Sequence, residues 1–119
     1  MSQDLKAGDF LVYQLESAVA LLRVLDVEGI GGEKVWHLTA YSEFFPDVEA
    51  AENAVAGLES LTTSMPHVAL TDRAFESTQV ARIAHMPLTD QEHLPLTQWR
   101  LDHVREIHDR SIRLLMGLR

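Results

Sequence analysis

Two apolar segments on either side of a glycine-rich turn constrain the fold of this chain more than any other feature. Residues 18–27 are rich in valine and leucine, and residues 34–41 alternate between apolar and polar side chains. Between them stands Gly29-Ile30-Gly31-Gly32, whose glycines admit the positive φ that a tight turn needs. Residues 10–16 alternate in the same way and precede both segments. Three strands joined by short turns predict an antiparallel meander.

The next part of the chain changes its hydrophobic period. Residues 46–57 place apolar side chains three and four residues apart, and Pro46 and Asp47 suit a helix start, which predicts a short helix. Residues 60–66 are predicted to form a loop, and residues 79–86 another strand ended by Pro87. Thr89 and Glu92 have the spacing of a capping box, a hydroxyl–carboxylate pair at a helix start.

The strongest helical period lies near the C-terminus. Leu101, Val104, Ile107 and Leu115 fall on one side of a helix drawn at about 100° per residue. One amphipathic helix over about residues 95–117 follows from this spacing. Its apolar stripe is wide enough for a helix that packs on a sheet.

Length and composition favour a single domain over residues 1–119. The chain has 119 residues, of which 46% are hydrophobic, and this suffices for one core. The sequence therefore predicts an α+β domain with a small, strongly bent antiparallel β-sheet over about residues 8–88, a short middle helix and the long C-terminal helix. The chain has no cysteine, which excludes disulfides, thiolate metal ligands and a cysteine nucleophile.

Charge argues against nucleic acid as a partner. Ten Lys and Arg oppose eighteen Asp and Glu, so the formal net charge is −8. Residues 35–72 hold six acids and no Lys or Arg, whereas binding to a phosphate backbone needs a basic face. This acidic middle suits solubility and fits a basic protein partner. No export signal or membrane-spanning apolar run is present, so we expect a cytoplasmic protein without membrane contact.

The motifs of metal, phosphate and hydrolase chemistry are missing from the sequence. His103 and His108 are five residues apart and diverge around a helix, and no spacing predicts that any two of the six histidines meet. There is no HExxH, no G-x-S-x-G and no phosphate-binding glycine loop. We therefore expect no metal, no cofactor and no catalytic residue.

The candidate binding residues are aromatic, acidic or imidazole side chains. Tyr41, Phe44 and Phe45 surround Glu43 where strand gives way to helix, and a turn that buries one Phe leaves the second as a contact surface. His108 falls on the apolar side of the predicted C-terminal helix, and His85 lies in the late strand. The exposed aromatics and a free strand edge predict a homodimer.

Two stretches carry a resemblance to known proteins. Leu5-Lys6-Ala7-Gly8-Asp9-Phe10 with Ala20-Leu21-Leu22-Arg23-Val24-Leu25, and Ile83-Ala84-His85-Met86-Pro87-Leu88-Thr89, resemble small SH3-like barrel proteins of bacteria. Some of these are immunity proteins of polymorphic-toxin systems. The resemblance implies an SH3-like barrel as the form of the bent sheet, and it implies no catalytic residue.

Two functions follow from these observations. The first is a non-enzymatic protein-binding module, of which an immunity-type inhibitor of a basic bacterial toxin is the form that the resemblance implies. The alternative is a small-ligand-binding or enzymatic domain whose site lies between the sheet and the C-terminal helix. A closed, dry seam there favours the first function, and an apolar cleft with convergent polar groups favours the second.

Overall fold

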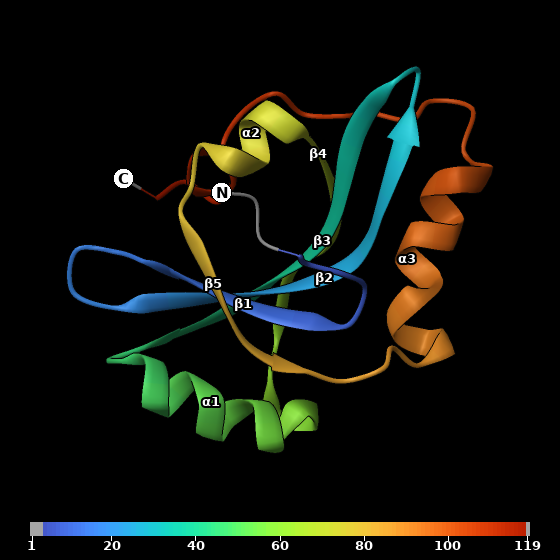
Figure 1. Ribbon diagram of the computed structural model, residues 1–119. Helices are drawn as coiled ribbons and strands as arrows, with labels where there is room; N and C mark the ends of the chain where they lie inside the picture. Colours follow the sequence, from blue (N-terminus) through green and yellow to red (C-terminus); the bar gives the residue numbers. More distant parts are fainter. Residues whose placement is uncertain (1–3, 119) are drawn as a thin grey trace.

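A five-stranded antiparallel sheet is the centre of the molecule (Figure 1). The computed structural model describes residues 4–118. Its strands are β1 (Asp9–Gln14), β2 (Val19–Ile30), β3 (Glu33–Phe45), β4 (Thr63–Thr71) and β5 (Val80–His85). They lie in the order β4-β3-β2-β1-β5, so the predicted meander of β1, β2 and β3 is confirmed and lies in the middle of the sheet.

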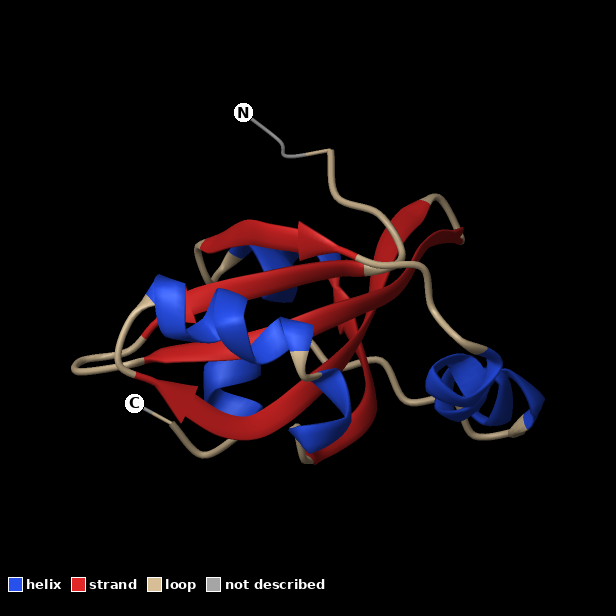
Figure 2. Cartoon of the chain, turned by 90° about the horizontal axis from the view of Figure 1, so that it is seen from below, coloured by secondary structure: helices blue, strands red, loops and turns tan. Residues whose placement is uncertain are grey.

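Short helices connect and flank the strands (Figure 2). They are α1 (Val48–Ala56), the 3-10 turn η1 (Leu58–Ser60), α2 (Asp72–Glu76), α3 (Asp90–Leu101) and α4 (Ile112–Leu115). The Asp47 side chain caps α1, and the predicted capping box of Thr89 and Glu92 opens α3. No helix within residues 4–118 has the length and apolar character needed to cross a membrane.

The strands β2 and β3 are long and bent. The turn between them uses Gly31 and Gly32 at φ +61° and +83°, as the glycine-rich turn predicts. Their pairing shifts register twice, between Ala20 and Leu22 and between Val24 and Asp26. Such bulges bend and twist a strand pair, so the sheet presents a curved face to the elements that cover it.

Both faces of the sheet are apolar at one end. On the first face, Trp36 stacks on Phe75 of α2 at 3.8 Å between ring centroids, and Ile112 of α4 joins the same core. On the second face, Phe10 and Tyr41 pack under Val55 of α1. Burial against α1, α2 and α4 therefore holds the sheet from both sides.

Three parts of the predicted architecture differ from the structure. The sheet ends in β4 on one side and β5 on the other, and among the described residues it does not close, so the SH3-like barrel is not confirmed. The sequence predicts a loop over residues 60–66, but β4 begins at Thr63 and pairs with β3. This segment is strand only through that pairing, since its own composition is polar and contains Pro66, a residue that edge strands tolerate.

The single long helix over residues 95–117 is also wrong. Helix α3 ends at Leu101, residues 102–111 are irregular, and α4 covers only four residues. Leu101 and Val104 of the predicted apolar stripe are 82% and 67% exposed. The backbone at His108 instead bonds the edge of β4: its N–H donates to the Ala69 carbonyl at 2.8 Å, and its carbonyl accepts from the Thr71 N–H at 2.9 Å. Pairing of the β4 edge has replaced helix formation.

Candidate functional site

A cavity of about 550 Å³ lies on the second face of the sheet, next to helix α3. Strands β2, β3 and β4 line it together with η1, the segment before α3 and the first turns of α3. Most of its walls are apolar, from Leu25, Leu58, Leu61, Pro66, Leu88 and Pro95. The polar side chains are Arg23, Thr39, Tyr41, Thr63, Thr89, Gln91 and Glu92.

Arg23 is the most deeply buried charged side chain of the cavity. It points inward from β2 and is only 1% exposed. Its guanidinium lies 4.2 Å from the Phe10 ring centroid, donates from Nη2 to the Met86 carbonyl at 2.8 Å, and pairs through Nη1 with Glu92 of α3. A buried cation is tolerated only with such partners, so Arg23 fixes the start of α3 against the sheet.

Glu92 is shared between that ion pair and the start of its own helix. One carboxylate oxygen accepts from the Thr89 N–H at 2.9 Å, and the other accepts from Arg23. The Thr89 hydroxyl accepts in turn from the Glu92 N–H at 3.2 Å. The carboxylate thus lies at the positive end of the helix dipole, which further favours its charge.

Two hydroxyl groups complete the polar part of the cavity. Thr39 donates its hydroxyl hydrogen to the Pro66 carbonyl at 2.9 Å, which leaves its oxygen free to accept. Tyr41 is 5% exposed, and burial raises the pKa of its phenol although nearby Arg23 opposes the rise. Both groups are therefore neutral hydrogen-bonding groups at physiological pH.

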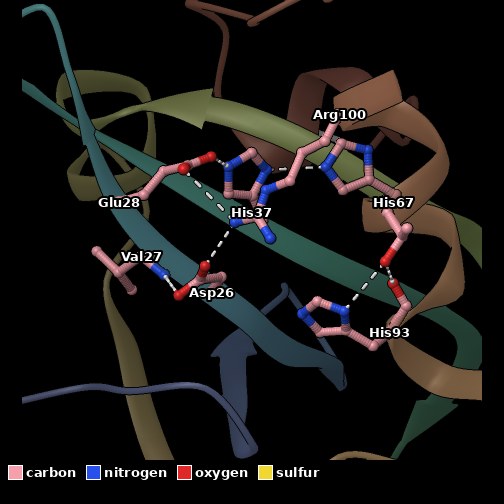
Figure 3. Close-up of polar contacts among 8 residues, drawn as sticks. Asp26, Val27, Glu28, His37, His67, His93 and Arg100 are labelled. Atoms are coloured by element: carbon pink, nitrogen blue, oxygen red, sulfur yellow. Dashed lines mark hydrogen bonds and ion pairs between the residues drawn. The ribbon is translucent and has the colours of Figure 1, made fainter. Parts of the chain in front are cut away.

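A chain of hydrogen bonds joins two histidines beside the cavity (Figure 3). His37 of β3 and His67 of β4 are 2.9 Å apart from Nδ1 to Nε2, and His37 Nε2 lies 2.6 Å from a Glu28 carboxylate oxygen. Trp99 of α3 covers both imidazoles, at 4.9 Å from the His37 ring and 5.4 Å from the His67 ring. Pro66, which lines the cavity, precedes His67 directly.

Charged neighbours surround the histidine pair on the β2 and α3 sides. Arg100 of α3 donates to Asp26 at 2.6 Å and lies 3.5 Å from Glu28. Burial lowers the pKa of His37, although Glu28 opposes the shift, and burial with the neighbouring His37 and Arg100 lowers the pKa of His67 to about 4. Both rings are consequently neutral at pH 7.

The geometry offers no metal centre in the part of the chain that is described. Within residues 4–118, no group of three or more His, Asp or Glu side chains is arranged to hold a metal ion. The His37 and His67 nitrogens that face one another are occupied by their mutual hydrogen bond.

The residues predicted as a site do not form one cluster. Tyr41 lines the cavity, while Phe45 packs against the second core. Phe44 is 46% exposed, and Glu43 accepts from the Thr62 N–H at 3.0 Å. His85 and His108 lie at opposite edges of the sheet: His85 Nδ1 is 2.7 Å from Asp9 on the β5 side, and the His108 backbone bonds β4. Of the predicted residues, therefore, Tyr41 alone belongs to the cavity.

Arg23, Glu92, His37 and His67 were missed as site residues. Two of them carried a signal, since Arg23 interrupts an apolar strand pattern and Glu92 completes the capping box. A buried arginine needs an acid, and Glu92 is positioned to supply it. The histidines carried no such signal, because His37 and His67 are thirty residues apart and meet only through the pairing of β3 with β4.

Comparisons with protein-family models, with curated proteins and with solved structures find no match for this chain.

Proposed function

We propose that this protein binds a small, mainly apolar and uncharged molecule in the cavity between the sheet and α3. The cavity itself carries the proposal: about 550 Å³ is within the range of roughly 300–1,000 Å³ that is typical of small-molecule sites. Most of its surface is apolar, and polar groups from the sheet and from the start of α3 converge on it, which is the arrangement that favours the ligand-binding alternative.

The charged side chains of the cavity favour an uncharged ligand. Arg23 and Glu92 neutralise one another, so neither needs a counter-charge from a ligand. A charged ligand would lose its water without gaining an opposite charge, which is costly in an apolar site. Thr39 and Tyr41 provide hydroxyls that suit a ligand hydroxyl or carbonyl group.

The lining residues favour binding over catalysis. The described cavity walls hold no histidine, serine or lysine, the side chains that most often act as general base or nucleophile. The carboxylate of Glu92 is engaged by Arg23 and by the Thr89 N–H. The structure therefore supports a binding domain, in which the ligand is held and not transformed.

A neutral fluorescent dye tests this function directly. N-phenyl-1-naphthylamine should bind with one site per chain and with an affinity in the micromolar range. Thr63 and Ser64 are exposed neighbours on β4, but only Thr63 lines the cavity. Thr63→Trp should weaken dye binding about tenfold or more by filling the cavity, since each tenfold step corresponds to about 1.4 kcal/mol. Ser64→Trp is the matched control and should leave it unchanged.

The absence of saturable dye binding would refute the function, as would equal affinities of the two tryptophan variants. Mass spectrometry of the protein purified from its source under native conditions provides a second measurement. It should show a neutral adduct that Thr63→Trp removes and Ser64→Trp retains.

Exposed apolar side chains around the β3–α1 connection support protein binding as a second candidate function. Phe44 at the end of β3 and Val48 at the start of α1 are 46% and 39% exposed. Glu43, Asp47 and Glu49 lie beside them in the sequence, so exposed apolar area is flanked by negative charge. We propose a basic protein as the occupant of this surface, and an immunity-type inhibitor of a basic toxin is one such module.

Site-specific cross-linking tests this second function. A photoreactive phenylalanine analogue at Phe44 should capture one basic protein in cells of the source, and capture should fall when Glu43 and Glu49 become glutamine. The same analogue at Leu114, which is 65% exposed on α4, is the control. Capture of the same proteins from both positions would contradict a specific surface at Phe44.

A further inference from the structure

We propose that α3 is a lid over the cavity and that protonation of the His37–His67 pair releases it in acid. This inference rests on the proposed binding function, because it describes how the ligand enters and leaves. The lid is defined as α3 with its packed side chains Glu92, Leu96, Trp99 and Arg100.

The packing of α3 makes it separable from the rest of the fold. Within residues 4–118, no side chain of α3 belongs to either core cluster of the sheet. Irregular segments flank it, residues 86–89 before and residues 102–111 after. Its buried residue is Leu96, and polar contacts fix its two ends. Elements with few apolar contacts open at a lower free energy than the core does.

The two ends of α3 are held by different polar contacts. Near its start, Glu92 pairs with Arg23 of the sheet. Near its end, Arg100 bonds Asp26, and Trp99 covers the rings of the histidine pair. The end of α3 therefore covers both imidazoles, and His37 is fully buried there.

Hydrogen-bonding roles fix the protons of this pair. The Glu28 carboxylate only accepts, so His37 Nε2 carries the hydrogen of that bond. A neutral His37 then accepts at Nδ1, so His67 must donate from Nε2. Both rings are neutral in this arrangement, and every nitrogen of His37 has a partner.

Added protons oppose this arrangement. With a proton on both rings, two N–H groups would face one another across 2.9 Å, because neither facing nitrogen could then accept. A proton on His67 would place a cation in a buried position near the guanidinium of Arg100. With the lid open, water solvates both rings and each accepts a proton near pH 6.5. Acid therefore favours the open lid.

The charged groups that face the pair do not cancel this effect. Asp26 and Glu28 come from β2 and favour a proton on His37, while Arg100 comes from α3 and disfavours it. His93, the imidazole that α3 itself carries, lies against Thr97 of its own helix at 3.3 Å. Burial is the largest influence on both His37 and His67, and it favours the neutral form.

The expected size of the effect follows from His67 alone. Its pKa is about 4 under the lid, against an ordinary value near 6.5 in water. Between pH 7.5 and pH 5 the opening equilibrium of the lid should therefore rise roughly 30-fold. Lowering of the His37 pKa acts in the same direction.

Native-state hydrogen exchange of the full chain measures that opening. Protection factors of the α3 amides, corrected for intrinsic exchange, should fall roughly 30-fold between pH 7.5 and pH 5. Amides of β1 and β2 should retain higher protection throughout. His67→Gln retains a donor to His37 but removes the titration, and it should reduce the pH effect about tenfold or more. His103→Gln is the control, because this imidazole is 97% exposed and should leave the effect intact.

Three results would overturn the lid. They are α3 protection that does not change with pH, α3 protection that always equals that of β1 and β2, and an unchanged pH effect in His67→Gln. The measurement needs no ligand, so it is separate from the dye experiment. Dye binding at pH 7.5 without lid opening at pH 5 refutes the lid alone, and lid opening without dye binding refutes the binding function.

Discussion

Replacing Glu92 by glutamine tests how α3 is joined to the sheet. Glutamine is nearly the same size, and it also satisfies a capping box, so the start of α3 retains its cap. The substitution removes the carboxylate that neutralises the buried guanidinium of Arg23. Arg23 would then retain the Met86 and Pro87 carbonyls and the Phe10 ring, but no opposite charge.

The cost follows from the burial of the two partners. Removal of one member of a buried ion pair typically costs about 3–5 kcal/mol, because the other charge is left uncompensated. Arg23 is 1% exposed, but Glu92 is 24% exposed, so some water reaches the pair. Glutamine has a single carbonyl oxygen, so it keeps one of the two hydrogen bonds that the carboxylate accepts, worth about 1 kcal/mol. The free energy of unfolding should therefore fall by about 2–3 kcal/mol.

Urea and thermal unfolding of matched variants measure this loss. At about 4 °C per kcal/mol for a domain of this size, Glu92→Gln should lower Tm by about 8–12 °C. Glu49→Gln is the control: it also removes an acid from the first turn of a helix, but from an exposed position of α1, and should change stability by about 0.5 kcal/mol or less. Arg23→Met should lower the free energy of unfolding less than Glu92→Gln does, because the partly exposed carboxylate that it leaves unpaired is easier to hydrate than a buried guanidinium. A loss below about 1 kcal/mol for Glu92→Gln would refute the desolvated pair.

Three further predictions concern the rest of the fold. Gly8→Ala should destabilise the protein by about 2 kcal/mol or more in urea unfolding, because Gly8 has φ +96° and an added Cβ would lie 2.5 Å from the Met86 carbonyl oxygen; a neutral change would contradict this close approach. Burial raises the pKa of Tyr13 to about 12 and raises that of Tyr41, so stability should fall as pH rises from 10 towards 12, by about 1.4 kcal/mol per pH unit for Tyr13. Absorbance of the native protein at 295 nm should show little tyrosinate at pH 10, and half-ionised tyrosines there would refute the burial. Exposed Phe44 and the position of β5 at one edge of the sheet predict a homodimer, so light scattering at micromolar concentration should give twice the chain mass, and a value of 13.4 kDa would reject it.

The parts of the fold that sequence reasoning predicts are those that depend on local pattern. The meander of β1 to β3, helix α1 and the cap of α3 each follow from alternation, spacing or turn chemistry within a few residues. Strand β4 was missed because nothing within it identifies a strand. Its Thr39–Pro66 hydrogen bond and its register with β3 are contacts across the sheet, which a single sequence does not display.

The prediction of a long helix over residues 95–117 is wrong for the opposite reason: the local pattern is present, but the fold does not use it. The sequence does have this period, but the buried positions in this region are Leu96 and Ile112, while Leu101 and Val104 face solvent. A helical period predicts a helix only where a surface is available to bury its stripe. Here α2 and α4 cover the first face of the sheet, and the backbone around His108 satisfies the β4 edge instead.

The distribution of polar residues on the second face explains why the cavity lies beside α3. Under α1 that face presents Val12, Leu21 and the Phe10 ring, so apolar burial fixes α1 in place. Towards α3 it presents Arg23, His37 and Thr39, all buried and all polar. Apolar residues of similar volume often stabilise such positions as well or better, so these side chains are a poor choice if stability were their only role. They hold α3 by contacts that depend on geometry and protonation, which suits an element that must close over a cavity and also leave it.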